Sequence, residues 1–283
     1  MDFTLVLIAA GLITGVGLLV GLFLGFSAIK FEVPVDEREI KIREALPGAN
    51  CGACGYPGCD GLAHAIVIDE APVSGCPVGG ADCAMAIGKI MGQSGSFEKT
   101  VAFVKCGGTC NRAGDKFIYS GIHDCNAAVV VPGGSPKQCG YGCMGLGSCV
   151  AACEYDAIHI VDGIAKVDPE KCVACKACVV ACPKELIEII PYTAKQVVRC
   201  MSKDKAKDVK VACEVGCIAC KRCVKVCPFD AIHVNDMLAK VDYDKCKRCR
   251  KCAKACPQNT ITFKLEDTDF WNPPQVEEEK ETA

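Results

Sequence analysis

The longest uniform pattern along the chain is an apolar run, residues 3–29, that contains no charged position. Roughly 20 such residues in a helix cross the hydrocarbon core of a bilayer, so we expect residues 1–30 to form one transmembrane helix with some tilt. Basic residues follow the run and none precedes it, which by the positive-inside rule places the rest of the chain in the cytoplasm. The sequence thus predicts a single-pass protein of the cell membrane.

Beyond residue 30 the pattern favours short elements. We expect helices over residues 36–46, 62–68 and 84–98, and short strands over 129–131, 157–161 and 164–167. Pro132, Gly133 and Gly134 are typical of a turn. The acidic, proline-containing stretch 265–283 is expected to be disordered.

Composition changes this picture, because 26 of the 283 residues are cysteine while the formal net charge is only −2. A disulfide scaffold is the first alternative, but the apolar run lacks the basic start of a secretory signal, and the cysteines recur in tight spacings that disulfides do not require. Zinc is the second alternative, although four cysteines within eleven residues suit cubane iron–sulfur clusters better. Such clusters favour a reducing compartment, in agreement with the cytoplasm.

Three cysteine runs have the spacing C-x2-C-x2-C-x3-C-P and begin at Cys172, Cys217 and Cys246. Bacterial ferredoxins hold two [4Fe-4S] clusters with such runs, and the fourth thiolate of each run crosses to the neighbouring cluster. A different spacing, C-x2-C-x4-C-x16-C, starts at Cys51 in a glycine-rich loop. Its glycines let the backbone approach a cluster closely.

A fourth run, from Cys139 to Cys153, is irregular, and an internal repeat shows how. The cysteines of residues 139–182 recur 74 positions later, within residues 213–256, so the chain contains one two-cluster module in duplicate. Leu146 stands where the second copy has Cys220. We expect Cys139 to supply the missing ligand, which leaves its counterpart Cys213 surplus.

The crossing rule then assigns five [4Fe-4S] clusters, each with four cysteine ligands. The five sets are Cys51, Cys54, Cys59 and Cys76; Cys139, Cys143, Cys149 and Cys182; Cys153, Cys172, Cys175 and Cys178; Cys217, Cys220, Cys223 and Cys256; and Cys227, Cys246, Cys249 and Cys252. Of the six others, Cys83 is expected to be a buried small residue. The rest form a candidate sixth cluster or are structural: Cys106, Cys110 and Cys125, completed by Cys200 or Cys213.

These observations indicate an α+β fold whose small modules are stabilised by their clusters. The expected parts are a transmembrane helix (1–30), a small helical 4Fe-4S domain (31–98), a cysteine-containing connecting segment (99–138), two tandem bacterial-ferredoxin-like modules (139–195 and 196–264) and the acidic tail (265–283).

Charge separates the two modules. Residues 139–190 contain four Lys or Arg and seven Asp or Glu, whereas residues 214–264 contain eleven and five. Six basic residues crowd around the last cysteine run: Lys245, Lys247, Arg248, Arg250, Lys251 and Lys254. Because basic patches attract acidic partners, this face is a candidate docking site for soluble ferredoxin, or else a solvated face without a partner. Nucleic acid is a poor alternative, since no aromatic platform accompanies the charge.

The apolar run, the loop from Asn50 to Cys59, Cys76-Pro77 and the ferredoxin-type modules together resemble the B subunits of the Rnf complex. The resemblance covers the chain to about residue 264, and the second module and residues 101–138 depart from the shorter form of that family. It implies a membrane complex that passes electrons from reduced ferredoxin to NAD and couples this to Na⁺ or H⁺ movement. A chain of this family would relay electrons to membrane and cytoplasmic partners that hold the flavin and the NAD site.

The residues themselves describe a conduit without a catalytic site of its own. No glycine-rich dinucleotide fingerprint occurs in a strand–helix context, no nucleophile–base pair is identifiable, and the apolar run has no ionisable residue that could conduct ions. The alternatives are a relay that reduces a redox-sensing transcription factor, a component of another membrane enzyme such as a hydrogenase, and a cluster-bearing sensor without net electron flow.

Overall fold

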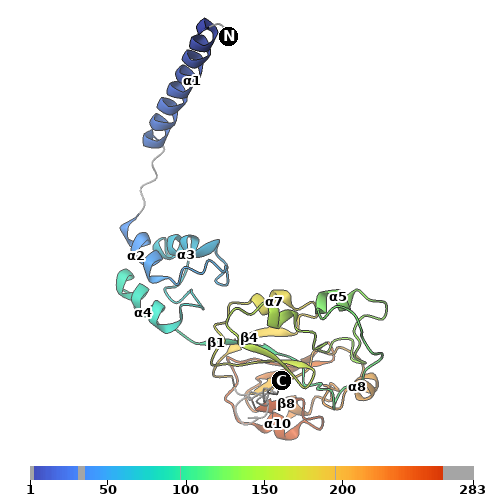
Figure 1. The fold of residues 1–283 in the computed structure, drawn as a ribbon. Helices are drawn as coiled ribbons and strands as arrows, with labels where there is room; N and C mark the ends of the chain where they lie inside the picture. The colour runs from blue at the N-terminus through green and yellow to red at the C-terminus, as the bar shows by residue number, and fades with distance from the viewer. Residues whose placement is uncertain (1–2, 31–35, 96, 195, 264–283) are drawn as a thin grey trace, which may run out of the picture.

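The structure is a computed structural model that describes residues 3–30, 36–95, 97–194 and 196–263; the side chains of residues 3–10, 28–29 and 263 are outside this description. Its first element is the helix α1 (Phe3–Lys30), which Figure 1 shows apart from the other elements. Within the part of the chain that the structure describes, no helix qualifies by length and apolar character as a membrane span. The span expected over residues 1–30 therefore stays a prediction, and the acidic tail 265–283 falls outside the described residues.

Three helices form the N-terminal domain: α2 (Glu37–Ala45), α3 (Gly58–Val67) and α4 (Gly80–Met91). The Asp36 side chain accepts a hydrogen bond from the Arg38 amide and so caps α2. Apolar side chains of all three helices are fully buried against one another, with Ile42, Leu62 and Ile87 at the centre. The helix expected over 84–98 begins earlier and is shorter, because Gly92 ends it in the left-handed conformation (φ 67°).

The ferredoxin-like part contains two-stranded antiparallel sheets with short helices between them. The strand pairs are β1 (Thr100–Val104) with β4 (Ile187–Pro191), β2 (Ile158–Val161) with β3 (Ile164–Val167), β5 (Gln196–Val198) with β8 (Ile261–Phe263), and β6 (Ile232–Asn235) with β7 (Leu238–Val241). The hairpin expected from residues 157–167 is confirmed. Strand β1 was not expected, because its partner β4 lies more than 80 residues away along the chain.

The short helices are α5 (Cys125–Val129), α6 (Ser148–Ala151), α7 (Ala177–Ala181), α8 (Ala206–Ala212), α9 (Arg222–Lys225) and α10 (Lys251–Ala255). The strand expected over 129–131 is wrong, since α5 ends there. The physical reason is a cap: the Asp124 carboxylate accepts a hydrogen bond from the Ala127 amide at 3.2 Å and starts a helical turn. The turn at 132–134 is present, closed by a hydrogen bond from Gly134 N–H to the Val131 carbonyl.

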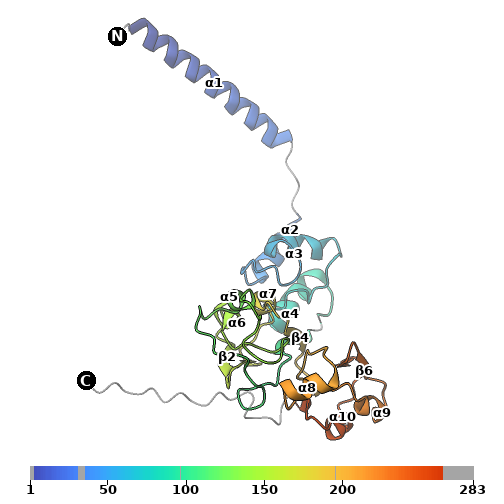
Figure 2. The ribbon, with the colours of Figure 1, turned by 90° about the vertical axis from the view of Figure 1, so that its right-hand side faces the viewer.

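The ferredoxin-like part consists of two units, each held together by strand pairing. We call them module 1 and module 2, in chain order. Segment 99–138 contributes β1 to module 1, where Phe103 is 2% exposed and packs in the main apolar core. Strand β5 plays the corresponding part in module 2. Figures 1 and 2 place module 2 farther from the N-terminal domain than module 1.

Candidate metal centres

The cysteine runs share a loop conformation. In the three regular runs, the residues before and after the second cysteine have positive φ: Ala174 and Lys176, Ala219 and Lys221, Arg248 and Arg250. Such successive left-handed turns form concave nests of N–H groups that suit anions and iron–sulfur sites. The irregular run keeps this loop with Gly145 (φ 72°) and Gly147 (φ 85°), although Leu146 lies between them instead of cysteine.

The two glycines allow a matched test of that loop. A Cβ at Gly145 would lie 2.5 Å from the Gly163 carbonyl oxygen, whereas a Cβ at Gly147 would meet nothing within 4 Å. Gly147→Ala should therefore cost only the left-handed strain, about 1–2 kcal/mol, and Gly145→Ala should cost more, because backbone has to move. Thermal unfolding of the two variants measures the difference, and equal losses would contradict the clash.

The N-terminal set lies on a loop and the helices beside it. Cys59 and Cys76 are buried in the domain core, Cys54 packs against it, and Cys51 is exposed. Gly79 N–H donates to the Cys76 sulfur at 3.3 Å. Cys83 is buried as expected, and its hydrogen bond to Cys76 lowers the pKa of the Cys76 thiol.

Module 1 brings together the set formed by Cys153, Cys172, Cys175 and Cys178. Burial raises the pKa of the Cys178 thiol to about 12, and the three other thiols of the set add to this rise. Strand β1 contributes a backbone donor, since Ala102 N–H points at the Cys172 sulfur at 3.4 Å. These four side chains are the ones that the crossing rule grouped.

Module 2 brings together both of its expected sets. One cavity is lined by Cys217, Cys220, Cys223 and Cys256. Around the other site, burial raises the pKa of the Cys252 thiol to about 11. The neighbouring thiols that raise it further are those of Cys246, Cys227 and Cys249. Ala231 N–H donates to the Cys227 sulfur at 3.4 Å.

The remaining set of module 1 differs from the expected one. The cavity that contains Cys143, Cys149 and Cys182 is completed by Cys125, not by Cys139. Burial raises the pKa of the Cys149 thiol to about 12, and neighbouring thiols that include Cys125 add to this.

Hydrogen bonds between α5 and α6 explain the position of Cys125. The Cys125 amide donates to the Ser148 hydroxyl at 2.7 Å, and that hydroxyl also bonds to Asp124. The start of α5 is thereby fixed beside Cys149 on α6. Sequence reasoning missed Cys125 because the nearest spare cysteine was chosen; the gap at Leu146 signalled a substitute but not its location.

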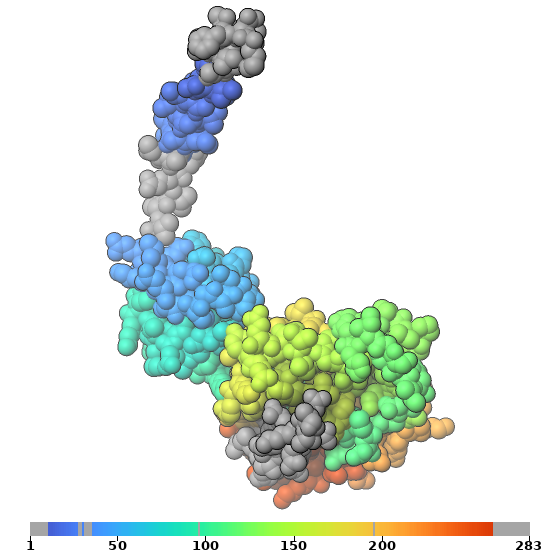
Figure 3. All heavy atoms as spheres, in the orientation of Figure 1, coloured from blue at the N-terminus to red at the C-terminus, as the bar shows by residue number. Residues whose placement is uncertain are grey.

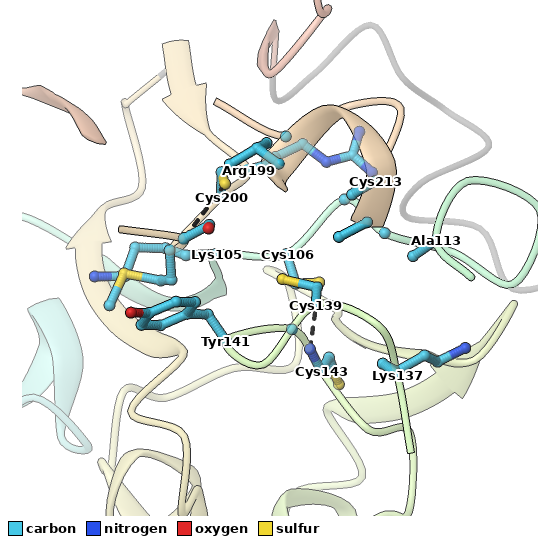
Figure 4. A pocket seen from close by; sticks show the side chains of 18 residues that line it. Lys105, Cys106, Ala113, Lys137, Cys139, Tyr141, Cys143, Arg199, Cys200 and Cys213 are labelled. Atoms are coloured by element: carbon cyan, nitrogen blue, oxygen red, sulfur yellow. Dashed lines mark hydrogen bonds between the residues drawn. The ribbon is translucent and has the colours of Figure 1, made fainter. Parts of the chain in front are cut away.

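Cys139 lines a separate cavity between the modules, together with Cys106, Cys200 and Cys213 (Figure 4). The last unassigned cysteine, Cys110, is exposed, and its sulfur lies 3.9 Å from the Lys137 ammonium. The expected grouping of Cys106, Cys110 and Cys125 is thus not what the structure brings together.

Four thiols around a cavity, with backbone N–H groups directed at sulfur, are the surroundings that [4Fe-4S] clusters take in proteins. Among the described residues, no three His, Cys, Asp or Glu side chains are placed as ligands of one metal ion. Cavities lined by four cysteines fit a multi-iron cluster, which takes four thiolate ligands. Buried thiols of raised pKa become ligands with loss of their protons, which couples cluster binding to folding.

The N-terminal site and module 1 are in contact. The Lys176 ammonium donates to the Ala53 carbonyl at 2.7 Å, and these residues lie in the loops of Cys175–Cys178 and Cys51–Cys54. The Cys51 thiol is also among the groups that raise the pKa of Cys175, after burial and nearer thiols. Figure 3 shows the N-terminal domain in contact with module 1.

The expected docking face lies on the surface of module 2. Five of its basic residues are exposed, namely Lys245, Lys247, Arg248, Lys251 and Lys254, and Arg250 is half-buried. Cys249 is exposed among them, so the last site reaches solvent at this face. Lys245 forms an ion pair with Asp242 at 3.8 Å, at the edge of the face.

Comparisons with known proteins agree with these sites. Residues 46–78 match the family described as a putative Fe-S cluster. Residues 216–261 match a 4Fe-4S dicluster domain, and residues 138–186 and 171–231 match a second family of that description.

Relatives cover most of the chain. The B subunit of the Na(+)-translocating ferredoxin:NAD(+) oxidoreductase complex of Acetobacterium woodii is 48% identical over 263 residues, which cover 92% of this chain and 79% of the relative. The B subunit of the proton-translocating ferredoxin:NAD(+) oxidoreductase complex of Clostridium ljungdahlii is 43% identical, and the match covers 82% of this chain and 83% of the relative. The B subunit of the ion-translocating oxidoreductase complex of Methanosarcina acetivorans is 40% identical, with 83% and 89% covered.

Proposed function

The chain belongs to the B subunits of Rnf-type ion-translocating oxidoreductase complexes, and on this premise we propose that it takes electrons from reduced ferredoxin at module 2 and relays them to the N-terminal site. It is an iron–sulfur electron-transfer component of an ion-translocating ferredoxin:NAD oxidoreductase complex, and it holds several [4Fe-4S] clusters. The observation that supports this direction is that exposed basic residues surround the exposed Cys249 on module 2, the module farther from the N-terminal domain.

The residues of this chain hold and tune the carriers. When bound, each cluster would carry one electron at a time. The chain contributes the thiolate ligands, the N–H groups that donate to sulfur and the buried surroundings. We propose Cys125, Cys143, Cys149 and Cys182 as one ligand set, alongside the four other sets expected from the sequence; the cavities and thiol clusters described above support this proposal. NAD reduction and ion movement are assigned to partner subunits.

The crossing pattern joins sites within a module. Cys153 belongs to the first run of module 1 but lies with Cys172–Cys178, and Cys182 from the second run lies with Cys149. Cys227 and Cys256 exchange in the same way in module 2. The two sites of each module therefore share cysteine runs, so the continuous backbone of each run keeps the two clusters close together.

We propose further that α1 anchors the chain in the lipid bilayer and that the cysteine-rich part faces the cytoplasm. The support is the run of residues 3–29 without charge, and the basic residues that follow it. Separation of membranes from soluble protein, followed by carbonate washing, tests the anchor: a variant that begins at residue 31 should become soluble. A truncated chain that stays with washed membranes would contradict it.

Charge reversal tests the docking face. Lys247→Glu, Arg248→Glu and Lys251→Glu together should slow association with ferredoxin by about tenfold or more at low salt, because steering by complementary charge accelerates encounter by that order. Stopped-flow reduction of the assembled complex by reduced ferredoxin measures the rate, and the difference should shrink as ionic strength rises.

A control with the same change in net charge separates docking from general repulsion. Lys41→Glu, Lys89→Glu and Lys116→Glu change three exposed lysines outside module 2. Their combined variant should keep most of the rate. An equal loss in both triple variants, or none in either, would remove this face as the docking site.

A further inference from the structure

The cavity between the modules is lined by four cysteines from four separate segments: Cys106, Cys139, Cys200 and Cys213 (Figure 4). We propose that these four residues bind a further [4Fe-4S] cluster, which joins module 1 to module 2. The binding of this cluster does not depend on the proposed direction of electron flow; only its role as a bridge does.

The internal repeat relates the four residues in pairs. Cys139 and Cys213 are 74 positions apart, the spacing at which the two modules correspond. Cys106 and Cys200 follow the equivalent strands β1 and β5, each after one basic residue. Each module thus contributes one cysteine that lies two residues after its first strand and one that lies four residues before Cys143 or its counterpart Cys217.

Backbone hydrogen bonds show that the Cys106 and Cys200 positions are structurally equivalent. Cys143 N–H donates to the Cys106 sulfur at 3.4 Å, and its counterpart Cys217 N–H donates to the Cys200 sulfur at 3.3 Å. The preceding residues are equivalent too: Lys105 N–H bonds to the Leu186 carbonyl at 2.8 Å, and Arg199 N–H to the Thr260 carbonyl at 2.9 Å.

The two halves of the cavity are therefore formed by equivalent segments of the two modules, with one such pair of cysteines from each module. Two cysteine pairs that line one cavity can supply four ligands to one cluster. The thiols of the two modules lie close together, since a Cβ placed at Gly108 would be 3.4 Å from the Cys213 sulfur and 3.7 Å from the Cys106 sulfur.

The surroundings suit an anionic group bound through thiolates. Cys106 is 7% exposed and Cys200 8% exposed, so their sulfurs are shielded from water. One basic side chain of the lining, Arg199, is buried to the same degree, at 6% exposed, whereas the ammonium of Lys137 is paired with Asp115 at 3.1 Å. Positive charge in the wall favours a cluster whose four thiolates outweigh the charge of its core.

This site lies between the sites of module 1 and those of module 2. Cys143 and Cys217, which donate to its sulfurs, are themselves members of the adjoining sets in module 1 and module 2. One hydrogen bond therefore separates the bridging site from the neighbouring site on either side. Without a cluster here, the two modules would meet only through protein.

Iron counting tests the site on the full-length chain, purified anaerobically in detergent and reconstituted with iron and sulfide. The wild-type chain should bind about 24 irons, for six clusters of four. The double variant Cys139→Ala/Cys213→Ala, which removes one ligand from each module, should bind about 20. Spin quantification by EPR after reduction with dithionite should show the loss of one cluster, and dithionite makes this readout independent of ferredoxin.

Cys110→Ala provides the matched control, because it removes an exposed cysteine of the same segment that lies outside the cavity. It should keep about 24 irons. The proposal is overturned by a wild-type count of about 20, by a double variant that keeps all of its iron, by loss of zinc instead of iron, or by an equal loss in Cys110→Ala.

Discussion

Cys178→Ala should abolish ferredoxin-dependent NAD reduction by the assembled complex. Cys178 is a buried member of the module 1 set that lies next to the N-terminal site, and its replacement removes a ligand rather than a supporting contact. Changes around metal sites that spare the ligands typically cost about 10–100-fold, so we expect a larger loss here. Steady-state rates with reduced ferredoxin measure it.

The same variant should still accept electrons at its far end. The sites of module 2 do not involve Cys178, so rapid reduction by ferredoxin should persist while electrons fail to reach NAD. Cys110→Ala serves as the control and should retain full activity. If Cys178→Ala keeps more than about a tenth of the NAD reductase rate, a smaller loss than even supporting contacts cause, the relay does not pass through this site.

Phe103→Ala should produce the largest loss of stability from a single apolar side chain. Phe103 lies on β1, is 2% exposed and is the largest of the fully buried side chains among the described residues. Truncation of a buried phenylalanine costs about 3–5 kcal/mol, which is a large part of the usual stability of a domain, about 5–15 kcal/mol. Thermal unfolding by circular dichroism should show a midpoint lower by roughly 6–20 °C.

Loss of iron should accompany that destabilisation, because β1 also supplies the Ala102 amide that donates to the Cys172 sulfur. Ile118→Ala is the matched control: its side chain is 96% exposed, and its truncation should shift the midpoint little. A midpoint for Phe103→Ala within a few degrees of the wild type would show that β1 is not needed to hold module 1 together.

Most of the correct predictions about the fold and the cysteine sites came from short repeated patterns in the sequence. Regular cysteine spacing determines both the loop conformation and the crossing of ligands, so the structure brings together three of the five expected sets as grouped. The hairpin at 157–167 was expected from the internal repeat, in which residues 157–159 and 165–168 match residues 231–233 and 239–242. Such features depend on neighbours within a few residues, which sequence patterns report directly.

The errors involve contacts between distant segments. Strand β1 pairs with β4, which follows it by more than 80 residues, and the sequence of residues 100–104 does not indicate that partner. Cys125 and Cys139 exchange the roles expected of them because the Ser148–Asp124 contact, not distance along the chain, decides which thiol reaches Cys149. Spacing alone could not distinguish the two cysteines.

Exposure of the cysteines has a consequence for damage by oxygen. Cys51 at one end of the chain of sites, and Cys220 and Cys249 in module 2, are exposed, whereas Cys143, Cys149 and Cys178 of module 1 are buried. Oxidation of thiolate sites follows their accessibility. Air should therefore destroy the exposed sites at the entry and exit of the relay first. A briefly oxidised protein would keep the buried sites of module 1, but these could no longer exchange electrons with the donor or the acceptor.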